Sequence, residues 1–534
     1  MNHGDRPASN VHGTRSPVLA LNGLAATSQP LASAAALRVL QDGGNAVDAA
    51  ICAAAVLNVV EPMSTGIGGD MFALVYMQQD GKPVGLNGSG WAGSKASVEF
   101  FKNRGLSEIP AIGMHSVTVP GAVAGWYKLH QRYGKLPMRR NLAPAIEYAE
   151  KGFPVSDIIA GQWQRAEDKL RAVLHTARDV LLDGGAPRHG DIVRFPRLGR
   201  TLRLIAEGGR DVFYKGEIAR EILEFSDTQD GTLTLQDLAD FDAQWIEPVS
   251  TSYRGYDIYE LGAQTQGITA LEMLNILEGF DLKGLEHNSA EHLHLMIEAK
   301  KLAFADRDEY IADPDKAHVP VERLISKEYA AERRKLISRT LTMPSPRPGL
   351  PENGDTVYLT VVDKDRNAVS FINSLFEAFG SGLIAGDTGV VLQNRGALFD
   401  LDPAHPNVIA PRKRPFHTLI PGMVLKDNKP FFSFDVMGAD NQPQGHVQVL
   451  VNLIDFGMDA QQAGEEPRFR HSGEEVLLES AFGPPVRSDL KKIGHHVNSA
   501  VEAWGGYQGI LIHPETGVLM GGSDPRKDGL AIGW

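Results

Sequence analysis

The sequence lacks several features that define common classes of protein. It contains one cysteine, Cys52, in 534 residues, which excludes an internal disulfide and a zinc site built from thiolates. No stretch reaches about 18 consecutive apolar residues, and the N-terminal segment has no apolar core of a secretory signal. We therefore expect a soluble, cytoplasmic protein. The formal net charge of −13 gives no electrostatic reason to expect nucleic acid or a membrane as partner.

The composition is otherwise ordinary for a globular protein, with 43% hydrophobic and 22% charged residues. Length alone favours about three domains. The strongest internal boundary is at 343–355, where four prolines precede the segment ENGD, a composition that suits neither a packed helix nor a central strand. An alternating β-branched run follows at once over 356–362. With a turn and a second strand over 368–375 it predicts a hairpin.

Local patterns predict further elements around this hairpin. Apolar residues at helical spacing, bounded by capping residues and glycines, indicate two helices near the N-terminus. Apolar runs and alternating patterns indicate three more strands. The predicted elements are helices over 30–40 and 45–58 and strands over 18–24, 71–77 and 253–261.

A glycine-rich segment, STGIGGD, occupies residues 64–70. It lies between a predicted helix and a predicted strand. A phosphate-binding loop needs the opposite order, because the helix that follows the loop must point its N-terminus at the phosphates. We therefore interpret Gly66, Gly68 and Gly69 as positions of close backbone packing, without a cofactor.

The histidines give no pattern of metal ligation. His292 and His294 are two residues apart on a predicted helix, so they point to different faces, and we expect them to be exposed. His495 and His496 are adjacent in a polar stretch, which also suggests a solvated surface. No HExxH motif or cysteine-based ligand set is present. We predict neither a metal nor a cofactor.

Thr356, the first residue of the predicted hairpin, could be purely structural or could carry chemistry. Attack of its hydroxyl on the carbonyl of Asp355, followed by hydrolysis, would split the chain and leave Thr356 with a free α-amino group. Such an amine has a pKa of roughly 7.7–8 and can act as general base beside its own hydroxyl. The acyl-enzyme would need oxyanion donors, and the loop VMGADNQPQ around Gly438 is a candidate.

Four segments, in chain order, carry a resemblance to a known family: GGNAVDAAICAAAVLNVVEPMSTGIGGDMFALV, TVPGAVAGW, EAKKLAFADRDEY and DTVYLTVVDKDRNAVSF. They resemble the γ-glutamyltransferase family of N-terminal nucleophile hydrolases. The resemblance implies an α+β fold, a four-layer αββα sandwich formed jointly by two fragments of one precursor. The large (α) fragment would be 1–355 and the small (β) fragment 356–534, interlocked as an αβ heterodimer that can pair into a dimer of these. The domain count from length is then set aside.

The family's catalytic positions match this sequence. The resemblance implies cleavage between Asp355 and Thr356, with Thr356 as nucleophile. The second hydroxyl, which hydrogen-bonds the nucleophile, falls on Ser374. The glycine pair of the oxyanion hole falls on Gly438 and Ala439, where the backbone donors are retained.

The family's substrate-recognition positions match less well. The family has an arginine, an asparagine, a glutamine, an aspartate and two serines there. The corresponding residues of this chain are Ser89, Phe376, Arg395, Leu398, His417 and Thr418. The aspartate pairs with the substrate's ammonium group, and Leu398 cannot do so. Arg395 and His417 remain as groups suited to a substrate carboxylate, with Arg412 and Arg414 close in sequence.

These observations favour an autoprocessed amidohydrolase that acts on a carboxylate-bearing small-molecule amide. The acyl-enzyme would be hydrolysed or transferred. The family default is a γ-glutamyl compound such as glutathione. The alternative is a short oxo-acid or dicarboxylic amide, such as oxamate or a glutaryl amide, which fits the lost aspartate. Two other hypotheses are a metal-dependent hydrolase, which no motif in the sequence supports, and an inactive homologue that acts as a binding protein.

Overall fold

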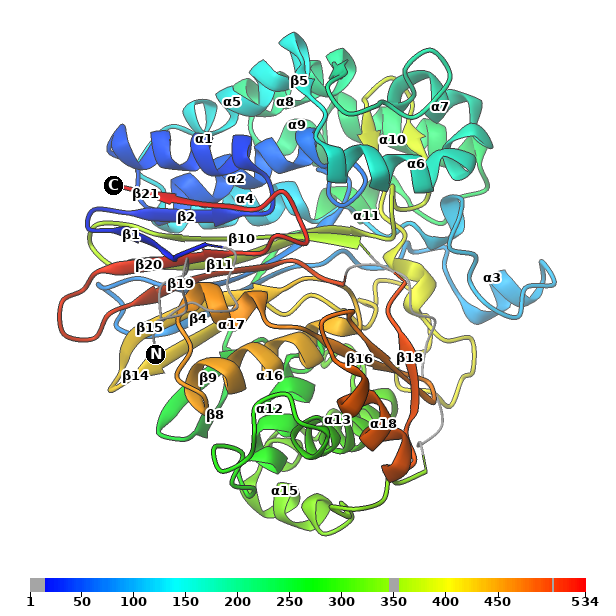
Figure 1. The fold of residues 1–534 in the computed structure, drawn as a ribbon. Helices are drawn as coiled ribbons and strands as arrows, with labels where there is room; N and C mark the ends of the chain where they lie inside the picture. The colour runs from blue at the N-terminus through cyan, green and yellow to red at the C-terminus, as the bar shows by residue number, and fades with distance from the viewer. Residues whose placement is uncertain (1–14, 345–354, 502–503) are drawn as a thin grey trace.

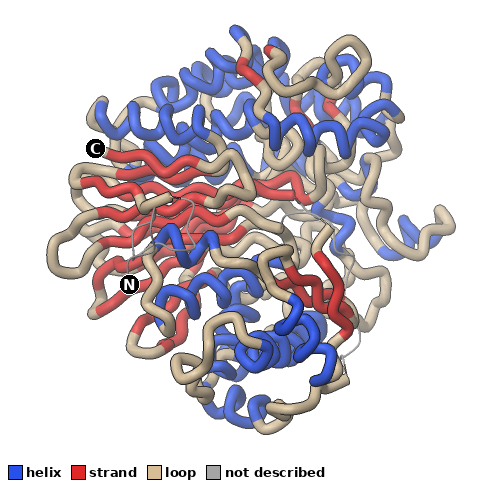
Figure 2. The backbone as a smooth tube through the Cα atoms, in the orientation of Figure 1, coloured by secondary structure: helices blue, strands red, loops and turns tan. Residues whose placement is uncertain are grey.

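The computed structural model describes residues 15–344, 355–501 and 504–534. Two seven-stranded sheets are stacked on each other, and a layer of helices covers the outer face of each sheet (Figure 1). Figure 2 shows the same order, with strands in the middle and helices above and below them. The fold is therefore the predicted α+β, four-layer αββα sandwich.

The sheet that carries Thr356 lies under the upper helices of Figure 1. Its strands, in spatial order, are β21 (Leu530–Gly533), β2 (Leu24–Thr27), β10 (Asp355–Val362), β11 (Ala368–Phe376), β3 (Asp70–Tyr76), β4 (Pro83–Gly88) and β7 (Gln244–Ile246). The predicted hairpin is confirmed as β10–β11, and the predicted strand over 71–77 is β3. On its other side β10 pairs with β2, so β10 lies near the middle of the sheet.

The second sheet faces the lower helices. Its strands, in spatial order, are β1 (Val18–Ala20), β20 (Leu519–Ser523), β19 (Tyr507–Ile512), β15 (Lys429–Val436), β14 (Gly422–Lys426), β9 (Tyr256–Glu260) and β8 (Val249–Tyr253). Apolar side chains fill the space between the two sheets, among them Phe72 and Tyr358 from one and Met423 and Ile510 from the other.

Two predicted strands are wrong in extent. The run over 253–261 is not one strand, because Arg254 (φ +52°) and Gly255 (φ +83°) make a tight turn that separates β8 from β9. The run over 18–24 is divided between β1 in one sheet and β2 in the other. The turn between them receives support from the C-terminus, where the Trp534 carbonyl accepts the N–H groups of residues 21 and 22.

Each sheet combines strands from before and after residue 355. In the sheet of β10, the strands β2, β3, β4 and β7 precede that residue, whereas β10, β11 and β21 do not. In the second sheet, β1, β8 and β9 come from the first part of the chain. The two parts therefore share one pair of sheets, and neither has a complete core alone.

The helical layers differ in origin. The upper layer comes from the N-terminal half and includes α1 (Pro30–Gln41), α2 (Ala46–Val60), α4 (Ala122–Tyr133), α5 (Met138–Lys151), α6 (Asp157–Arg171), α7 (Leu174–Val180), α8 (Pro196–Gly208) and α10 (Glu217–Thr228). The lower layer includes α12 (Gly267–Leu277), α13 (Ala290–Tyr310), α15 (Lys327–Arg334), α16 (Asn441–Ile454), α17 (Ala460–Glu465) and α18 (Pro484–Ile493). Both helices predicted near the N-terminus are confirmed as α1 and α2.

The prediction that His292, His294 and His495 are exposed is wrong. All three are buried, and only His496 is exposed. The reason lies in α13, which passes through the lower layer against α12 and α18 and is covered on most of its sides. A helix of this kind buries polar residues on every face, so two-residue spacing does not place a side chain in solvent. Among the described helices, none has the length and apolar character of a membrane span.

Candidate active site

Thr356 lies at an irregularity in the β10–β11 ladder. Asp355 pairs with Phe376 and Val357 with Asn373, so Thr356 alone faces two residues of β11. Such a bulge redirects the side chain from the regular alternation. The Thr356 side chain is buried, and its Oγ1 lies 3.1 Å from Oγ of Ser374 on β11. The structure therefore brings together the two hydroxyls that the sequence singled out.

The Ser374 hydroxyl is held by two donors besides its contact with Thr356. The backbone N–H of Phe376 donates to Ser374 Oγ at 2.8 Å, and Nη2 of Arg395 donates to it at 3.2 Å. Phe376 has φ +79°, an uncommon conformation for a large residue, and this turn accompanies the return of its N–H to Ser374. In the 3.1 Å contact between Ser374 and Thr356, either hydroxyl can be the donor.

The glycine-rich turn supports Ser374 from behind. A Cβ atom on Gly69 would lie 2.2 Å from the carbonyl oxygen of Ser374, and one on Gly68 would lie 2.1 Å from that of Val391. No side chain fits at these distances. The prediction of close backbone packing is confirmed for Gly68, against Val391, and for Gly69, against Ser374, whereas Gly66 has only the Leu375 side chain nearby.

Arg395 is a fully buried cation beside the two hydroxyls. Its Nη1 donates to Thr418 Oγ1 at 2.8 Å, and its guanidinium lies 4.4 Å over the ring of Phe376. Burial lowers the pKa of Arg395 to about 9, although Asp70 opposes this, so the group stays protonated at neutral pH. No carboxylate of the described residues lies within ion-pair distance of it, and its Nε has no acceptor there.

His417 is neutral and contacts a carboxyl group that the sequence analysis missed. Its Nδ1 accepts the N–H of Leu419 at 3.3 Å, so Nε2 carries the proton and donates to Asp70 Oδ2 at 3.1 Å. Burial, with the charge of Arg395, holds the pKa of His417 well below its usual value. Burial also raises the pKa of Asp70 to about 7. Asp70 ends the glycine-rich segment and pairs with Ser374 across β3–β11, a position that its sequence context could have suggested.

Ser89 reaches the same cluster through Gln264. The Gln264 side chain donates to Ser89 Oγ at 2.6 Å, and the Gln264 carbonyl accepts the N–H of His417 at 2.9 Å. Arg414 Nε donates to the carbonyl of Ser89 at 3.2 Å. The structure thus connects Ser89 with His417 and Arg414. Arg412, by contrast, pairs with Asp237 and Asp240.

Leu398 lies in an apolar cluster with Phe376 and Phe416. Both rings are buried, and Ile268 and Ile311 belong to the same cluster. Leu398, which the resemblance aligns with the family's aspartate, therefore belongs to an apolar cluster that reaches Arg395 through Phe376.

Gly438 and Ala439 form a turn of unusual backbone geometry at the end of β15. Their φ angles are +123° and +45°. Neither N–H donates to an acceptor among the described residues, whereas both carbonyls accept hydrogen bonds, from Asn441 and Gln442. Consecutive backbone N–H groups without acceptors are typical of an anion-binding turn.

Two side chains from the first part of the chain hold this turn, and the sequence analysis missed both. Gln266 Nε2 donates to the carbonyls of Ala439 and Thr418, each at 2.8 Å. Arg307 Nη1 in turn donates to Gln266 Oε1 at 3.0 Å and to Asp440 Oδ1 at 2.9 Å. A continuous set of buried hydrogen bonds thus connects the Gly438–Ala439 turn through Thr418 to the two hydroxyls.

A separate histidine cluster lies in the lower helical layer. His294, Glu298 and His495 have side-chain atoms close enough to hold a metal ion. Their atoms already bond to one another and to neighbours: His294 Nδ1 lies 2.8 Å from His495 Nε2, and Lys301 Nζ donates to Glu298 at 2.8 Å. The Thr342 hydroxyl also donates to Glu298. An ammonium group beside the carboxylate disfavours a second cation, so we interpret the cluster as an anchor for the segment around Thr342.

Comparison with known proteins agrees with this geometry. The family model described as gamma-glutamyltranspeptidase matches residues 32–534. The chain is 40% identical to a glutathione hydrolase-like proenzyme of Bacillus subtilis, covering 94% of this chain and 97% of that protein. It is 36% identical to an oxamate amidohydrolase proenzyme of Klebsiella pneumoniae, with 96% and 98% covered. The crystal structure of cephalosporin acylase from Bacillus halodurans superposes with a TM-score of 0.93 at 44% identity, over 99% of each chain. The chain therefore belongs to the gamma-glutamyltranspeptidase family of N-terminal nucleophile hydrolases.

Proposed function

We propose that this chain is a precursor that cleaves itself between Asp355 and Thr356 and then hydrolyses amides through Thr356. In the first step Thr356 Oγ attacks the Asp355 carbonyl, the peptide C–N bond breaks as an ester forms, and water hydrolyses the ester. The products are fragments 1–355 and 356–534, and the second begins with the free amine of Thr356. The observation that carries this proposal is the 3.1 Å contact between the buried hydroxyls of Thr356 and Ser374 at a strand bulge.

The catalytic cycle repeats the same chemistry on a substrate. The Thr356 amine takes the proton of its own hydroxyl as Oγ attacks the amide carbonyl, and the proton passes to the leaving amine. Ser374 donates a hydrogen bond to Thr356 Oγ and keeps it aligned. The N–H groups of Gly438 and Ala439 stabilise the oxyanion, which fits their lack of acceptors among the described residues. Water then hydrolyses the ester, or an amine accepts the acyl group.

The acyl portion of the substrate carries a carboxylate, and Arg395 binds it. A buried cation without a paired carboxylate is costly, and a substrate anion would supply the missing partner. Three of the five N–H groups of a guanidinium are not used by Thr418 and Ser374. Thr418, His417 and Ser89 complete this side of the site. Within this class γ-glutamyl compounds such as glutathione are the family default.

One observation favours a second candidate for the acyl group. Recognition of a γ-glutamyl group also requires a partner for its ammonium, and Leu398 lies among Phe376 and Phe416 where the family has an aspartate. An apolar surface does not compensate a buried ammonium, and the unmet charge costs several kcal/mol. A short oxo-acid amide such as oxamate, or a dicarboxylic monoamide such as a glutaryl amide, has no ammonium group. These substrates fit the apolar surface better.

The test has two stages. Intact-mass measurement and N-terminal sequencing of the purified protein should give two chains, the smaller beginning Thr-Val-Tyr-Leu. A single stable chain of 58.0 kDa would contradict the proposal. The processed enzyme is then assayed on glutathione, a γ-glutamyl anilide, oxamate, and glutaryl and succinyl amides. Faster turnover of oxamate or the glutaryl amide than of the γ-glutamyl compounds would establish the second candidate. Faster turnover of the γ-glutamyl compounds would establish the family default.

A further inference from the structure

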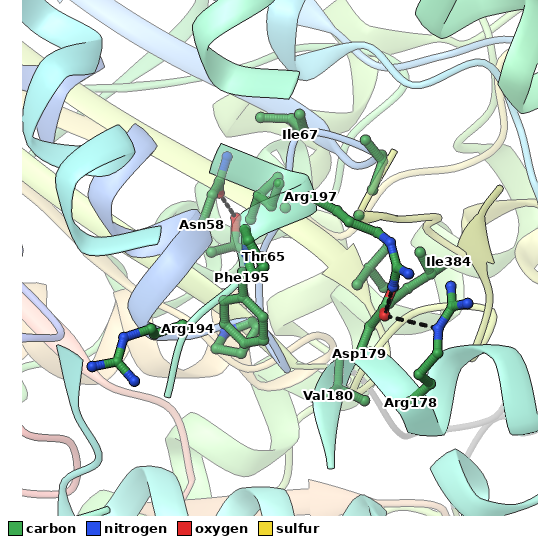
Figure 3. Close-up of a pocket in the computed structure, with 17 residues that line it drawn as sticks. Asn58, Thr65, Ile67, Arg178, Asp179, Val180, Arg194, Phe195, Arg197 and Ile384 are labelled. Atoms are coloured by element: carbon green, nitrogen blue, oxygen red, sulfur yellow. Dashed lines mark hydrogen bonds and ion pairs between the residues drawn. The ribbon is translucent and has the colours of Figure 1, made fainter. Parts of the chain in front are cut away.

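A cavity of about 320 Å³ lies among the upper helices, beside the glycine-rich turn (Figure 3). Its walls come from the end of α2 and the following turn, from the end of α7, from the start of α8, and from the short hairpin of β12 (Ile384–Ala385) and β13 (Val390–Val391). A volume near the lower end of the roughly 300–1,000 Å³ typical of ligand pockets suits one small molecule.

This cavity is distinct from the active site. None of the proposed catalytic or substrate-binding residues lines it. Gly66 separates the two, because it lines the cavity, whereas the side chain of Leu375, next to Ser374, lies 3.4 Å from the position of a Cβ on that glycine. A ligand in the cavity would therefore contact the glycine-rich turn at Gly66 and Ile67.

The inner wall of the cavity is apolar. Phe195 lies in its centre, with the indole of Trp163 stacked behind the ring at 6.2 Å between centroids. The other apolar walls are Pro62, Ile67, Val180, Leu198, Ile384, Val390 and Val391. An apolar group of a ligand would gain roughly 25 cal/mol for each Å² of surface that it buries here.

The packing that forms this wall is tightly constrained. Gly389 has φ +70°, and a Cβ atom there would lie 2.4 Å from the backbone nitrogen of Leu198 in the first turn of α8. The β12–β13 hairpin thus approaches α8 as closely as a glycine permits. The cavity therefore has fixed walls on the helical side.

One edge of the cavity carries an ion cluster, whereas Asn58 and Thr65, which hydrogen-bond to each other at 2.7 Å, line another part of it (Figure 3). Arg178 and Arg197 lie on either side of Asp179, and both also contact Asp387 at 3.4 Å. These contacts leave Nη1 of Arg178 and Nη2 of Arg197 without an acceptor among the described residues. Both side chains are partly exposed, so a ligand could reach them. Arg194 lines the opposite side and points away from this edge (Figure 3).

We propose that the cavity is a second binding site, for a small monocarboxylate with an aromatic or aliphatic body. The carboxylate would accept from the remaining N–H groups of Arg178 and Arg197, which keep their carboxylate partners, and the apolar body would lie against Phe195 and Val391. A cation is disfavoured, because the lining residues include three arginines and one acidic side chain.

The test uses the purified wild-type protein and two probes, 4-phenylbutanoate and its neutral analogue 4-phenylbutan-1-ol, in isothermal titration calorimetry. We expect one 4-phenylbutanoate per chain and at least tenfold weaker binding of the alcohol. Arg197→Gln removes part of the polar edge, and Val391→Phe fills the cavity without changing its charge. Each should weaken 4-phenylbutanoate at least tenfold. Arg203→Gln is the matched control, because Arg203 lies on the same helix α8 and pairs with Glu150 on the surface.

Three results would overturn the proposal. The first is no binding of 4-phenylbutanoate to the wild type at millimolar concentration. The second is equal binding to wild type, Arg197→Gln and Val391→Phe, with thermal unfolding confirming that both variants are folded. The third is loss of binding in Arg395→Ala with retention in both cavity variants, which would place the probe in the active site. Binding is measured without turnover, so failure of this proposal is distinguishable from failure of the proposed amidohydrolase.

Discussion

The proposed active site consists of two halves that differ in construction. The nucleophile half comprises Thr356, Ser374, Gly438 and Ala439, and its polar groups are hydroxyls and backbone N–H groups. The recognition half comprises Ser89, Arg395, His417 and Thr418, and its interactions come largely from ionisable side chains, including the contact between His417 and Asp70. Apart from the half-buried Gly438, the residues of both halves are buried, and Ser374 and Thr418 join the two halves.

The difference has a physical cause. A strand bulge and a turn with positive φ present the same backbone groups whatever the neighbouring side chains are, so bond cleavage can be retained while the substrate changes. Recognition depends on charge and shape, which single substitutions alter. The relatives fit this view, since proteins named glutathione hydrolase-like and oxamate amidohydrolase match this chain in sequence, and one named cephalosporin acylase matches it in fold. The predictions below test whether the two halves are separable.

The largest effect should come from the nucleophile half. Thr356→Ala removes the attacking oxygen, so we expect one uncleaved chain of 58.0 kDa and no detectable amidase activity. Intact-mass spectrometry and a substrate assay measure both. Thr356→Ser is the control: it keeps the oxygen and should still be processed. Normal cleavage of Thr356→Ala would show that another group attacks the Asp355 carbonyl.

Arg395→Ala should separate the halves. It removes the guanidinium that binds the carboxylate of the substrate. We therefore expect KM for an acidic amide to rise by about 10- to 100-fold, with processing retained. Arg395→Lys keeps the positive charge but lacks the paired N–H donors of a guanidinium. Its KM should lie between those of wild type and Arg395→Ala. Steady-state kinetics and intact mass are the measurements. If Arg395→Ala is not processed, Arg395 acts on the nucleophile half through its contact with Ser374. The two halves are then not separable at this residue.

Gln266→Leu should affect the rate of the chemical step more than binding. The side chain donates a hydrogen bond to the carbonyl of Ala439 and therefore fixes the orientation of the proposed oxyanion donors. Loss of one direct oxyanion donor costs about 10²–10³ in kcat, and an indirect support should cost about tenfold. We expect KM to stay within about twofold of wild type. A rise in KM with unchanged kcat would assign Gln266 to the recognition half, through its contact with Thr418.

The smallest effect concerns an ion cluster beneath the nucleophile half. His446 Nδ1 lies 2.8 Å from Glu260 Oε1, and His446 Nε2 lies 2.9 Å from Asp435 Oδ1. Asp435 is on β15, the strand that leads to Gly438. Burial opposes its charge, but Glu260 and Asp435 prevail and raise the pKa of His446 to about 9. A folded-state pKa above the unfolded value of about 6.5 stabilises the fold fully below pH 6.5, and this contribution is lost as pH rises towards 9.

His446→Gln should therefore flatten the dependence of stability on pH. The uncleaved Thr356→Ala chain is the suitable background, because it can unfold and refold as one molecule. In urea unfolding, the free energy of unfolding of that chain should fall between pH 6.5 and 9 by roughly 1–3 kcal/mol more than that of the double variant. Burial also raises the pKa of Glu260 to about 7, which adds a loss of the same sign between pH 4.5 and 7. Parallel profiles for the two chains would contradict the assignment.

Distance along the chain explains which contacts of the proposed site could be predicted from the sequence. Thr356 and Ser374 are 18 residues apart on one hairpin, which alternation and turn residues predicted, whereas the family resemblance singled out Ser374. Gln266 and Ala439 are 173 residues apart and meet only through the packed layers. Asp70 was missed for another reason. The interpretation of its segment considered only the glycines, and no residue near Asp70 in the sequence indicates a contact with the distant His417.

Two errors show the limits of periodicity. The alternating run over 253–261 was interpreted as one strand because Arg254 gives no warning of a left-handed turn, although Gly255 after it does. His292 and His294 were expected in solvent because helix spacing separates their directions, but α13 is enclosed by its neighbours. Pattern specifies the element, whereas enclosure is a property of the assembled layers.

The sharing of both sheets by the two parts of the chain has a consequence for the history of each molecule. While residues 355 and 356 are joined, β2, β10 and β11 assemble within one chain, and folding needs no encounter between molecules. Once that bond is cut, the same assembly would require two separate polypeptides to meet at their cellular concentrations. The mature enzyme would then be unable to return to its native state by the route that made it. Its lifetime would be set by how slowly it unfolds, so selection would act on the unfolding barrier more than on equilibrium stability.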